Sequence, residues 1–494
     1  MTVGDRVHSV PPTTKARVAA PWIAGRSVEP GGWVEFQDPY RLEPVSRVGV
    51  SDASVVAEAV RAAVEAQPRV AAMSIAERAA VLRRAAEIID GRVEELAETV
   101  TRQIGKALKN TRREVGRSVW TLRAAATAAE SLEGVLAPTT VASGGGGLVA
   151  MVWRVPVGVV GAVTPFNAPF NLVAHKLAPA FAAGNAVVLK PASQTALTAL
   201  DFVAIMEEAG APPGAFNVVP GDRRTVHALV ADPRVAVFSL TGGRAAGEAV
   251  ARDAGARRVL LELGGNSPNI VHGDADVELA ARDCAAGGFA NTGQSCNSVQ
   301  RIYVQASIAD AFTEALVREA RKLRVGDPLD PATDVGTLVN LEAAQRVATW
   351  LDEAVASGAR ILAGGDRSGA SIAPTVVANA PDESRIVCEE VFGPVVAVLP
   401  YDTLDEAIAR ANDSPFGLQA AIFTSSLSVA FSAATRLEAG GVLVNRSTNY
   451  RLDHLPYGGV KGSGVGREGP AYAIEEMTER KLVLIDPDPA HRPA

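Results

Sequence analysis

The sequence predicts an α/β protein with two domains, and three observations support this prediction. Its 494 residues exceed what a single core usually holds. Apolar runs alternate with helical segments over residues 158–265, and a second alternation of the same kind follows. Continuous apolar strands separated by helices indicate parallel sheets that are covered on both faces. Residues 133–157 interrupt this pattern with two strand-like runs around a glycine cluster, which predicts a β-hairpin.

The composition restricts the class of protein. A content of 48% hydrophobic and 21% charged residues is typical of a soluble globular chain. The net charge of −7, without a long basic run, argues against nucleic acid as a partner. No stretch has the apolar length of a signal peptide or a membrane span, so we expect no membrane contact. Three cysteines cannot form a disulfide framework, which favours a cytoplasmic location. The six histidines are scattered along the chain, so we expect that the protein has no metal site.

The N-terminal third is predicted to be mostly helical. Residues 1–20 are polar and are expected to form a loose arm, and residues 21–50 suggest short strands and turns. Residues 51–132 have apolar positions at three- and four-residue spacing, which predicts a series of helices with a packing role. Ser74 and Glu77 form a capping box that opens the second of these helices.

Two sets of strands and helices follow. In the first set, strands are expected at residues 157–163, 186–189, 216–219, 235–238 and 259–263, with helices at 172–183, 195–208, 223–231 and 244–254. In the second set, strands are expected at 269–271, 301–304, 395–399, 421–423 and 442–444, with helices at 308–323 and 341–357. Such sheets bind ligands beyond the carboxyl ends of their strands. A late strand at residues 481–485 is expected to join the hairpin of residues 133–157, whose exposed edges an oligomer would cover.

Cys296 ends a run, residues 286–296, that has neither a helical nor a strand period. We expect this run to be a loop or a helix start, where unpaired backbone N–H groups lower the pKa of a thiol. The alternative for a lone cysteine is a small buried apolar residue. Glu262 is flanked by leucines and glycines, and its burial would raise its pKa toward that of a general base. Asn167 closes the first strand of the sheet, where its amide would donate to an oxyanion.

Two further motifs indicate a nucleotide. Gly242 and Gly243 lie between a strand and a helix, so a phosphate could approach the helix N-terminus, although a plain turn is the alternative. Lys190 and Ser193 follow another strand, where a ribose or its phosphate would lie unless the lysine is merely solvated. The literal GxGxxG at residues 464–469 follows no strand and is not interpreted as a dinucleotide fingerprint.

Nine motifs together carry a resemblance to a known family. They are Pro165–Asn167, Lys176 with Pro179–Asn185, Lys190–Pro191, Phe216–Gly221, Thr241–Gly242, Glu262–Asn266, Gly293–Cys296, Glu389–Pro394 and Pro456–Gly464. In this order they make the chain resemble the aldehyde dehydrogenase superfamily over nearly its full length. The resemblance implies a Rossmann-like cofactor domain (residues 1–132 and 158–267), an α/β catalytic domain (268–469) and an oligomerisation element (133–157 and 470–494). It also implies a homodimer or homotetramer.

The resemblance implies a role for each matching residue. Cys296 would attack the aldehyde, Asn167 would hold the oxyanion, and Glu262 would activate water, while Lys176 and Glu468 would relay protons. The residues implied for the cofactor are Thr164, Pro165, Phe166, Lys190, Ser193, Gly221, Thr241, Gly242, Gly243, Leu263, Glu390 and Phe392. The cofactor that the resemblance implies is NADP or NAD. Ser193 stands where many NAD-preferring members carry a glutamate, which would repel a 2′-phosphate. The serine therefore favours NADP. Arg223 and Arg224 would add positive charge near the adenine end of the cofactor.

The positions that match the substrate tunnel of the family are unusually polar. They are Arg117, His175, Ser295, Asn297, Arg446, Thr448 and Tyr450. We expect Arg117 and Arg446 to form an anion clamp, and hence a small polar or anionic aldehyde as the substrate. The tail of residues 466–479 resembles that of lactaldehyde and phosphonoacetaldehyde dehydrogenases, although Ala168 departs from the latter.

Two alternatives to hydrolytic aldehyde oxidation follow from the sequence. The first is transfer of the acyl group to coenzyme A, which the presence of Glu262 disfavours. The second is a non-catalytic binding or structural protein on the same fold, against which the intact set of Cys296, Glu262 and Asn167 argues.

Overall fold

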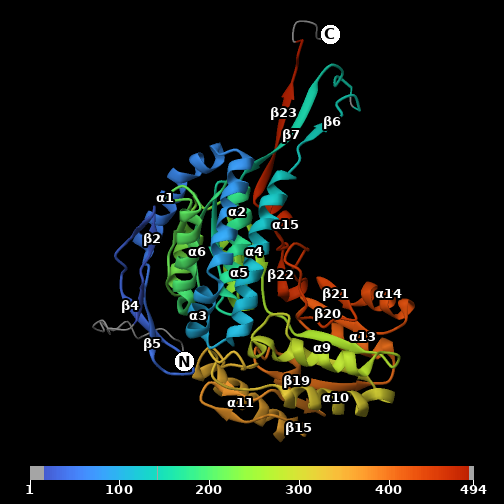
Figure 1. Ribbon diagram of the computed structural model, residues 1–494. Coiled ribbons are helices and arrows are strands. Elements are labelled where there is room, and N and C mark those ends of the chain that lie inside the picture. The colour runs from blue at the N-terminus through green and yellow to red at the C-terminus, as the bar shows by residue number, and fades with distance from the viewer. Residues whose placement is uncertain (1–15, 142, 489–494) are drawn as a thin grey trace.

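The computed structural model describes residues 16–141 and 143–488, which form two α/β lobes and a projecting β-ribbon (Figure 1). Most of the loose arm expected at residues 1–20 lies outside the described residues. Residue 142 of the hairpin turn and residues 489–494 of the predicted oligomerisation element also lie outside them.

The first lobe is built on an eight-stranded sheet of order β22-β12-β11-β8-β9-β10-β2-β3. Its parallel strands are β8 (Val159–Val163), β9 (Ala186–Lys190), β10 (Phe216–Val218), β11 (Val237–Thr241) and β12 (Arg258–Glu262). The antiparallel edges are β22 (Gly464–Val465) and the pair β2 (Trp22–Ile23) and β3 (Arg26–Ser27). The chain passes from β8 to β9 and β10 on one side and then crosses to β11 and β12 on the other. It therefore has the topological switch point of a Rossmann-like sheet between β8 and β11.

Helices cover both faces of this sheet. One face packs against α2 (Ile75–Gly91), α3 (Val93–Ile104), α4 (Leu108–Glu130), α5 (Pro169–Ala182) and α6 (Ala196–Glu208). The other face packs against α1 (Ala53–Ala72), α7 (Arg223–Ala231) and α8 (Arg244–Ala254). The predicted capping box at the start of α2 is present, since the Ser74 and Glu77 side chains bond each other's backbone N–H groups. A small sheet of β1 (Arg17–Ala19), β5 (Pro44–Gly49) and β4 (Trp33–Gln37) lies beside α6.

The second lobe contains a seven-stranded sheet of order β15-β18-β19-β14-β13-β20-β21. Its strands are β13 (Ser267–Val271), β14 (Val299–Gln305), β15 (Arg360–Ala363), β18 (Thr375–Ala378), β19 (Val395–Tyr401), β20 (Gln419–Phe423) and β21 (Gly441–Val444), of which β15 is antiparallel. One face carries α9 (Val277–Phe289) and α10 (Ala309–Lys322). The other carries α11 (Leu341–Ala356), α12 (Arg385–Cys388), α13 (Leu404–Asn412) and α14 (Leu427–Arg436). Beside this sheet lies a short hairpin of β16 (Arg367–Ser368) and β17 (Ser371–Ile372).

The projecting ribbon has the order β23-β7-β6. Its strands are β6 (Val135–Ala137), β7 (Val149–Pro156) and β23 (Thr478–Ile485), so the late strand joins the hairpin as the sequence predicts. Figure 1 shows the ribbon extending away from both lobes. The helix α15 (Pro470–Glu476), which precedes β23 in the chain, does not extend with the ribbon. It packs on α4 and α5 of the first lobe. Among the described residues, no helix has the length and apolar character that crossing a membrane requires.

Two assignments of the sequence analysis need correction. Residues 286–289 have no visible period in the sequence, yet they form the last turn of α9, because Gly287 and Gly288 allow that helix to pack closely on β14 and β19. The strand β22 was assigned with the catalytic domain, but it pairs with β12 of the first sheet. This pairing brings residues 464–469, and Glu468 with them, against the first lobe.

Candidate active site

The predicted cofactor residues lie together at the carboxyl edge of the first sheet. Thr164 and Pro165 follow β8, Lys190 ends β9, and Thr241 ends β11. Thr164 and Thr241 therefore flank the switch point between β8 and β11, where doubly wound sheets bind ligands. Helix α8 begins immediately after Gly243, which provides no side-chain cap, so its first N–H groups face outward from the sheet edge. The geometry therefore fits a phosphate at Gly242 and Gly243.

The neighbouring positions fit the sugar of a dinucleotide. The Ser193 hydroxyl donates to the Gly221 carbonyl at 2.8 Å, so both residues line the same corner. Burial lowers the pKa of Lys190 to about 8, and the nearby Asp222 carboxylate acts in the opposite direction. An added phosphate anion would likewise favour the charged ammonium of Lys190.

The second lobe contributes Glu390 and Phe392 to this region. A carboxylate oxygen of Glu390 accepts a hydrogen bond from the Gly265 N–H at 3.0 Å, and burial raises its pKa to about 7. The rings of Phe392 and Phe166 meet edge to face, with centroids 5.9 Å apart. Leu263 packs beneath α8, where it fills the space beside Gly247.

Cys296 lies in a turn between the 3-10 helix η2 (Ala290–Gly293) and β14. Asn291 and Thr292 take left-handed φ values of 52° and 56°, which fold the chain back toward the first lobe. The segment after Glu262 passes so close that a Cβ on Gly265 would lie 2.2 Å from the Cys296 carbonyl oxygen. Only glycine fits there, and the two lobes thus meet at the thiol.

The expectation of a lowered thiol pKa was wrong for this structure. Burial raises the pKa of Cys296 to about 12, although a hydrogen bond from Tyr457 and the charge of Arg451 act in the opposite direction. The sequence shows the unpaired N–H groups of a loop but not the depth at which the loop is buried. Cys296 is only partly exposed, and the desolvation of the thiolate outweighs any help from the backbone.

Glu262 is buried at the end of β12, with one carboxylate oxygen unpaired among the described residues. Burial and the charge of Glu468 raise its pKa well above the ordinary value, as the sequence predicts. Lys176 on α5 donates to the Ser239 hydroxyl at 3.1 Å and to Glu468 at 3.3 Å. Burial alone would raise the pKa of Glu468, but Lys176 and Arg451 hold it at about 2. The structure therefore brings the predicted base and the predicted relay pair into one buried cluster.

Asn167 lines the cavity beside Cys296, but its amide already has a partner. Its Nδ2 donates to the Gln294 carbonyl at 2.9 Å. An amide nitrogen carries two N–H groups, so one remains for a second acceptor. The Asn167 Oδ1 atom is buried without a partner among the described residues.

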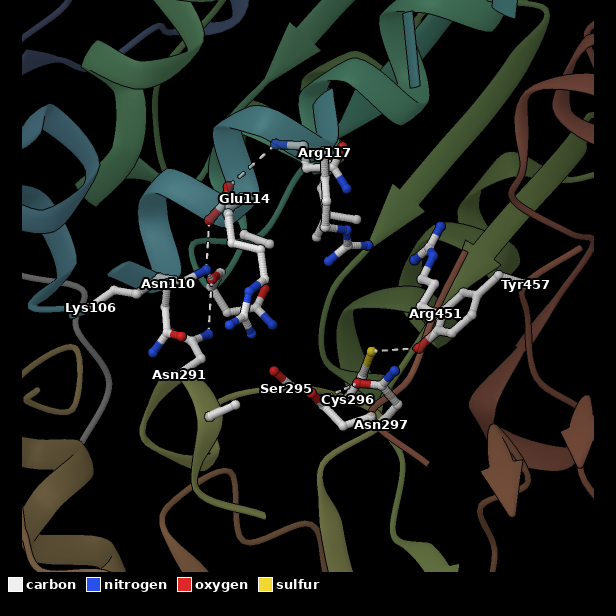
Figure 2. Close-up of a pocket in the computed structure, with 17 residues that line it drawn as sticks. Lys106, Asn110, Glu114, Arg117, Asn291, Ser295, Cys296, Asn297, Arg451 and Tyr457 are labelled. Atoms are coloured by element: carbon white, nitrogen blue, oxygen red, sulfur yellow. Dashed lines mark hydrogen bonds and ion pairs between the residues drawn. The ribbon is translucent and has the colours of Figure 1, made fainter. Parts of the chain in front are cut away.

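A cavity of about 130 Å³ opens in front of Cys296 (Figure 2). The side chains of α4 face Ser295, Cys296 and Asn297 across it, while Arg451 and Tyr457 close one side. Its lining is polar and rich in positive charge: Lys106, Asn110, Arg113, Glu114, Arg117, Asn167, Ala168, Asn171, Leu172, Ala290, Asn291, Ser295, Cys296, Asn297, Asn449, Arg451 and Tyr457.

Most of the positive charges around the cavity are already paired. Lys106 contacts Glu114 at 2.6 Å, and Arg117 forms a bidentate pair with Asp453 at 2.6 and 2.9 Å. Arg113 is exposed and has no ionic or hydrogen-bonding partner among the described residues. It lies one helical turn before Arg117 on the same face of α4. Within the described part of the chain, Arg113 is therefore the positive charge at this cavity that has no partner.

Four of the predicted substrate residues do not line the cavity. Arg446 is exposed and stacks on the Tyr450 ring at 5.3 Å, because Asn445 takes a left-handed φ of 55° and ends β21 there. Thr448 is buried and bonds Asn269. His175 is fully buried behind the cavity wall, 2.9 Å from Asp453. Of the two arginines predicted to form the clamp, only Arg117 lines the cavity, and Arg113 lines it beside Arg117.

Five of the charged or aromatic residues that line the cavity were not predicted from the sequence as site residues, namely Lys106, Arg113, Glu114, Arg451 and Tyr457. Arg113 was detectable, since it precedes Arg117 by four residues in a segment predicted to be helical. Tyr457 belongs to the Pro456–Gly464 motif, but the sequence does not show that it lies beside Cys296. Nothing in the sequence signals Arg451, whose position depends on an irregular loop.

Comparison with known proteins agrees with this geometry. The model of the aldehyde dehydrogenase family matches residues 23–483. The 3-sulfolactaldehyde dehydrogenase of Priestia megaterium is 45% identical over 454 residues, which cover 92% of this chain and 95% of that protein. Among solved structures, aldehyde dehydrogenase 21 of Physcomitrella patens, in complex with the reaction product succinate, is 37% identical, with a TM-score of 0.92 and coverage of 96% and 99%. The NADP-dependent glyceraldehyde-3-phosphate dehydrogenase of Bacillus halodurans, complexed with NADP, is 33% identical, with a TM-score of 0.93 and coverage of 95% and 99%.

The family model spans most of the chain, and the relatives match nearly all of it over nearly all of their own length. The two-lobed fold with a Rossmann-like sheet is the one that the sequence predicts. The chain therefore belongs to the aldehyde dehydrogenase family and is an NAD(P)-dependent enzyme that oxidises aldehydes.

Proposed function

We propose that this enzyme oxidises a short aldehyde with an anionic tail, a sulfonate or a carboxylate, to the free acid. The observation that supports this most strongly is the unpaired Arg113 on the wall of the small cavity in front of Cys296. The relatives point the same way, since one is named for a sulfonated aldehyde and another was solved with the dicarboxylate succinate.

In the proposed mechanism, the Cys296 thiol loses its proton to a base and its sulfur attacks the aldehyde carbon. The second Nδ2–H of Asn167 and the backbone N–H of Cys296 stabilise the oxyanion that forms. When bound, NAD(P) would supply the acceptor for the hydride that leaves the tetrahedral carbon, and Glu390 and Phe392 are among the residues that would hold it. Oxidation of the thiohemiacetal leaves a thioester on Cys296.

Glu262 then completes the reaction. Its raised pKa suits a general base that takes a proton from water as the water attacks the thioester carbon. The buried pair of Lys176 and Glu468, which is electrostatically coupled to Glu262, offers a route by which this proton leaves the site. A carboxylate in this position favours hydrolysis, and the coenzyme A alternative is not favoured.

The tail of the substrate is proposed to contact Arg113 and Arg117. A guanidinium pairs with sulfonate or carboxylate oxygens through directed N–H groups. The charge of Arg117 is already balanced by Asp453, so Arg117 mainly orients the tail of the substrate. Arg113 supplies the net charge, and Asn110 beside it supplies an amide.

The Arg113→Ala variant tests this proposal. We expect its kcat/KM for 3-sulfolactaldehyde to fall about tenfold, since a charged hydrogen bond contributes about 1.5 kcal/mol or more. Lactaldehyde lacks only the sulfonate, so its kcat/KM should hardly change. Both values come from the absorbance of the reduced cofactor.

Arg112→Ala is the matched control, because this neighbouring arginine pairs with Glu94 and does not line the cavity. It should behave as the wild type does with both substrates. Hexanal and benzaldehyde should be poor substrates of the wild type. A preference for either of them over the charged aldehydes would contradict the proposal.

The same assay compares the two cofactors. Ser193 brings a hydroxyl and not a carboxylate to the corner beside Gly221, and Lys190 stands nearby, so we propose that NADP is used at least as well as NAD. Arg224 adds less charge than the sequence suggests, because Asp222 pairs with it at 2.9 Å. Strict use of NAD would contradict this assignment.

We further propose that the ribbon pairs with a second copy of the chain. Leu136 is 73% exposed on β6, and Leu482 and Leu484 are 61% and 54% exposed on β23. Exposed apolar side chains on edge strands require a cover. Light scattering should give a mass of two or four chains, and Leu482→Glu with Leu484→Glu should shift it toward one. A wild-type mass of one chain would exclude the proposal.

A cytoplasmic location stays a prediction, with which the three unpaired cysteines agree.

A further inference from the structure

The Tyr457 hydroxyl contacts the Cys296 thiol. The Oη and Sγ atoms are 3.1 Å apart, within the range of a hydrogen bond to sulfur (Figure 2). Tyr457 is 5% exposed, and its hydroxyl reaches the same cavity that the thiol faces. None of the steps proposed above uses this residue.

Tyr457 is held in place from two directions. Its backbone N–H donates to the Glu468 carbonyl at 3.0 Å, and the Glu468 N–H donates back to the Tyr457 carbonyl at 2.6 Å. The Arg451 guanidinium lies 3.9 Å from the centre of the Tyr457 ring and also contacts the Glu468 carboxylate at 3.1 Å. The ring is therefore clamped between a backbone bridge and a fixed cation, and its hydroxyl has little freedom to turn away from Sγ.

The direction of the hydrogen bond follows from the surroundings. Burial raises the pKa of Tyr457 well above its ordinary value, so the phenol keeps its proton throughout the working pH range. A phenol that remains protonated donates to a thiolate once the thiol has lost its own proton. The cation over the ring withdraws electron density from the phenol and makes it a better donor.

We propose that Tyr457 is a positioning residue that holds Sγ of Cys296 and stabilises its thiolate before the aldehyde is attacked. The proposal rests on Cys296 being the nucleophile. In this step the S–H bond breaks, its proton passes to water, and the electron pair stays on sulfur. Tyr457 keeps its own proton and donates a hydrogen bond to that pair. When the C–S bond forms, the charge moves to the oxyanion and the bond from Tyr457 weakens.

The Tyr457→Phe variant tests the proposal by removing one oxygen atom and keeping the ring under Arg451. The readout is the rate at which iodoacetamide labels Cys296 in the full-length enzyme without substrate, followed by peptide mass spectrometry between pH 6 and pH 10. Loss of a charged hydrogen bond should raise the thiol pKa by about one to two units. Because a more basic thiolate is also more nucleophilic, labelling at pH 7.5 should slow by about 3- to 12-fold. Over this range, which lies below the raised pKa of the thiol, the rate should rise with pH in both enzymes but stay lower in Tyr457→Phe by this factor, and kcat/KM should fall by a similar factor.

Tyr303→Phe is the matched control, because its buried hydroxyl bonds Arg301 and the Arg410 carbonyl, away from Cys296. It should label as the wild type does. Unchanged labelling of Tyr457→Phe would overturn the proposal, and faster labelling would show that the hydroxyl restrains the thiol instead. If Cys296→Ala retained activity, the proposed nucleophile would fail separately, because the labelling experiment measures thiol reactivity and not turnover.

Discussion

The Cys296→Ala variant is expected to lose aldehyde-dependent cofactor reduction by about four to six orders of magnitude. Losses of this size accompany removal of the nucleophile in enzymes that form a covalent intermediate. The cavity contains no second thiol, since Cys284 is buried within α9 and Cys388 lies in α12. The measurement is kcat/KM with 3-sulfolactaldehyde, followed through the reduced cofactor.

The control is Cys388→Ala, which removes an exposed thiol outside the cavity. It should retain wild-type kinetics, and both variants should unfold at temperatures close to that of the wild type. If Cys296→Ala were active, or if Cys388→Ala were not, the assignment of the nucleophile would be wrong. Iodoacetamide should inactivate the wild type and the Cys388→Ala variant at similar rates, which separates loss of the thiol from a change in folding.

The predicted site residues that the structure brings together share a simple relation to the backbone. Glu262, Thr241 and Lys190 each end a strand of the first sheet, and parallel strands bring their carboxyl ends to one edge whatever the side chains do. The apolar runs thus predict both the sheet and the edge at which these residues meet. The burial of Glu262 follows in the same way, since its flanking leucines lie in the core.

The incorrect predictions concern residues in irregular segments. The side chain of Arg446 points to solvent because of one left-handed residue, Asn445, which no periodic pattern reveals. Arg451 reaches the cavity from an irregular loop, where it contacts Asp453 and Glu468. The thiol pKa was mispredicted for a related reason: the backbone around Cys296 is local information, whereas its desolvation depends on elements from both lobes.

The Glu262→Gln variant is expected to complete the first turnover and then stall. Cys296 and the oxyanion donors remain, so the thioester should form and one equivalent of reduced cofactor should appear per active site. Hydrolysis should then slow by about 10²- to 10⁴-fold, which is the usual contribution of a general base. Rapid mixing would show a burst at nearly the wild-type rate, followed by a much lower steady rate.

The pH dependence gives an independent test of the same role. The base acts only as a carboxylate, and burial with the charge of Glu468 raises the pKa of Glu262 well above 4.5. Wild-type hydrolysis should therefore fall as the pH is lowered through this raised pKa, and the steady rate of Glu262→Gln should lose that dependence.

The matched control is Glu207→Gln, another carboxyl group whose pKa burial raises, which lies on α6 and accepts a hydrogen bond from Trp22. It should keep both the burst and the wild-type steady rate. If Glu262→Gln showed no burst, Glu262 would be needed before the thioester forms, as the base that takes the proton from Cys296. An unchanged steady rate would instead mean that water is activated by another group, and Glu262 would then be a buried structural carboxyl.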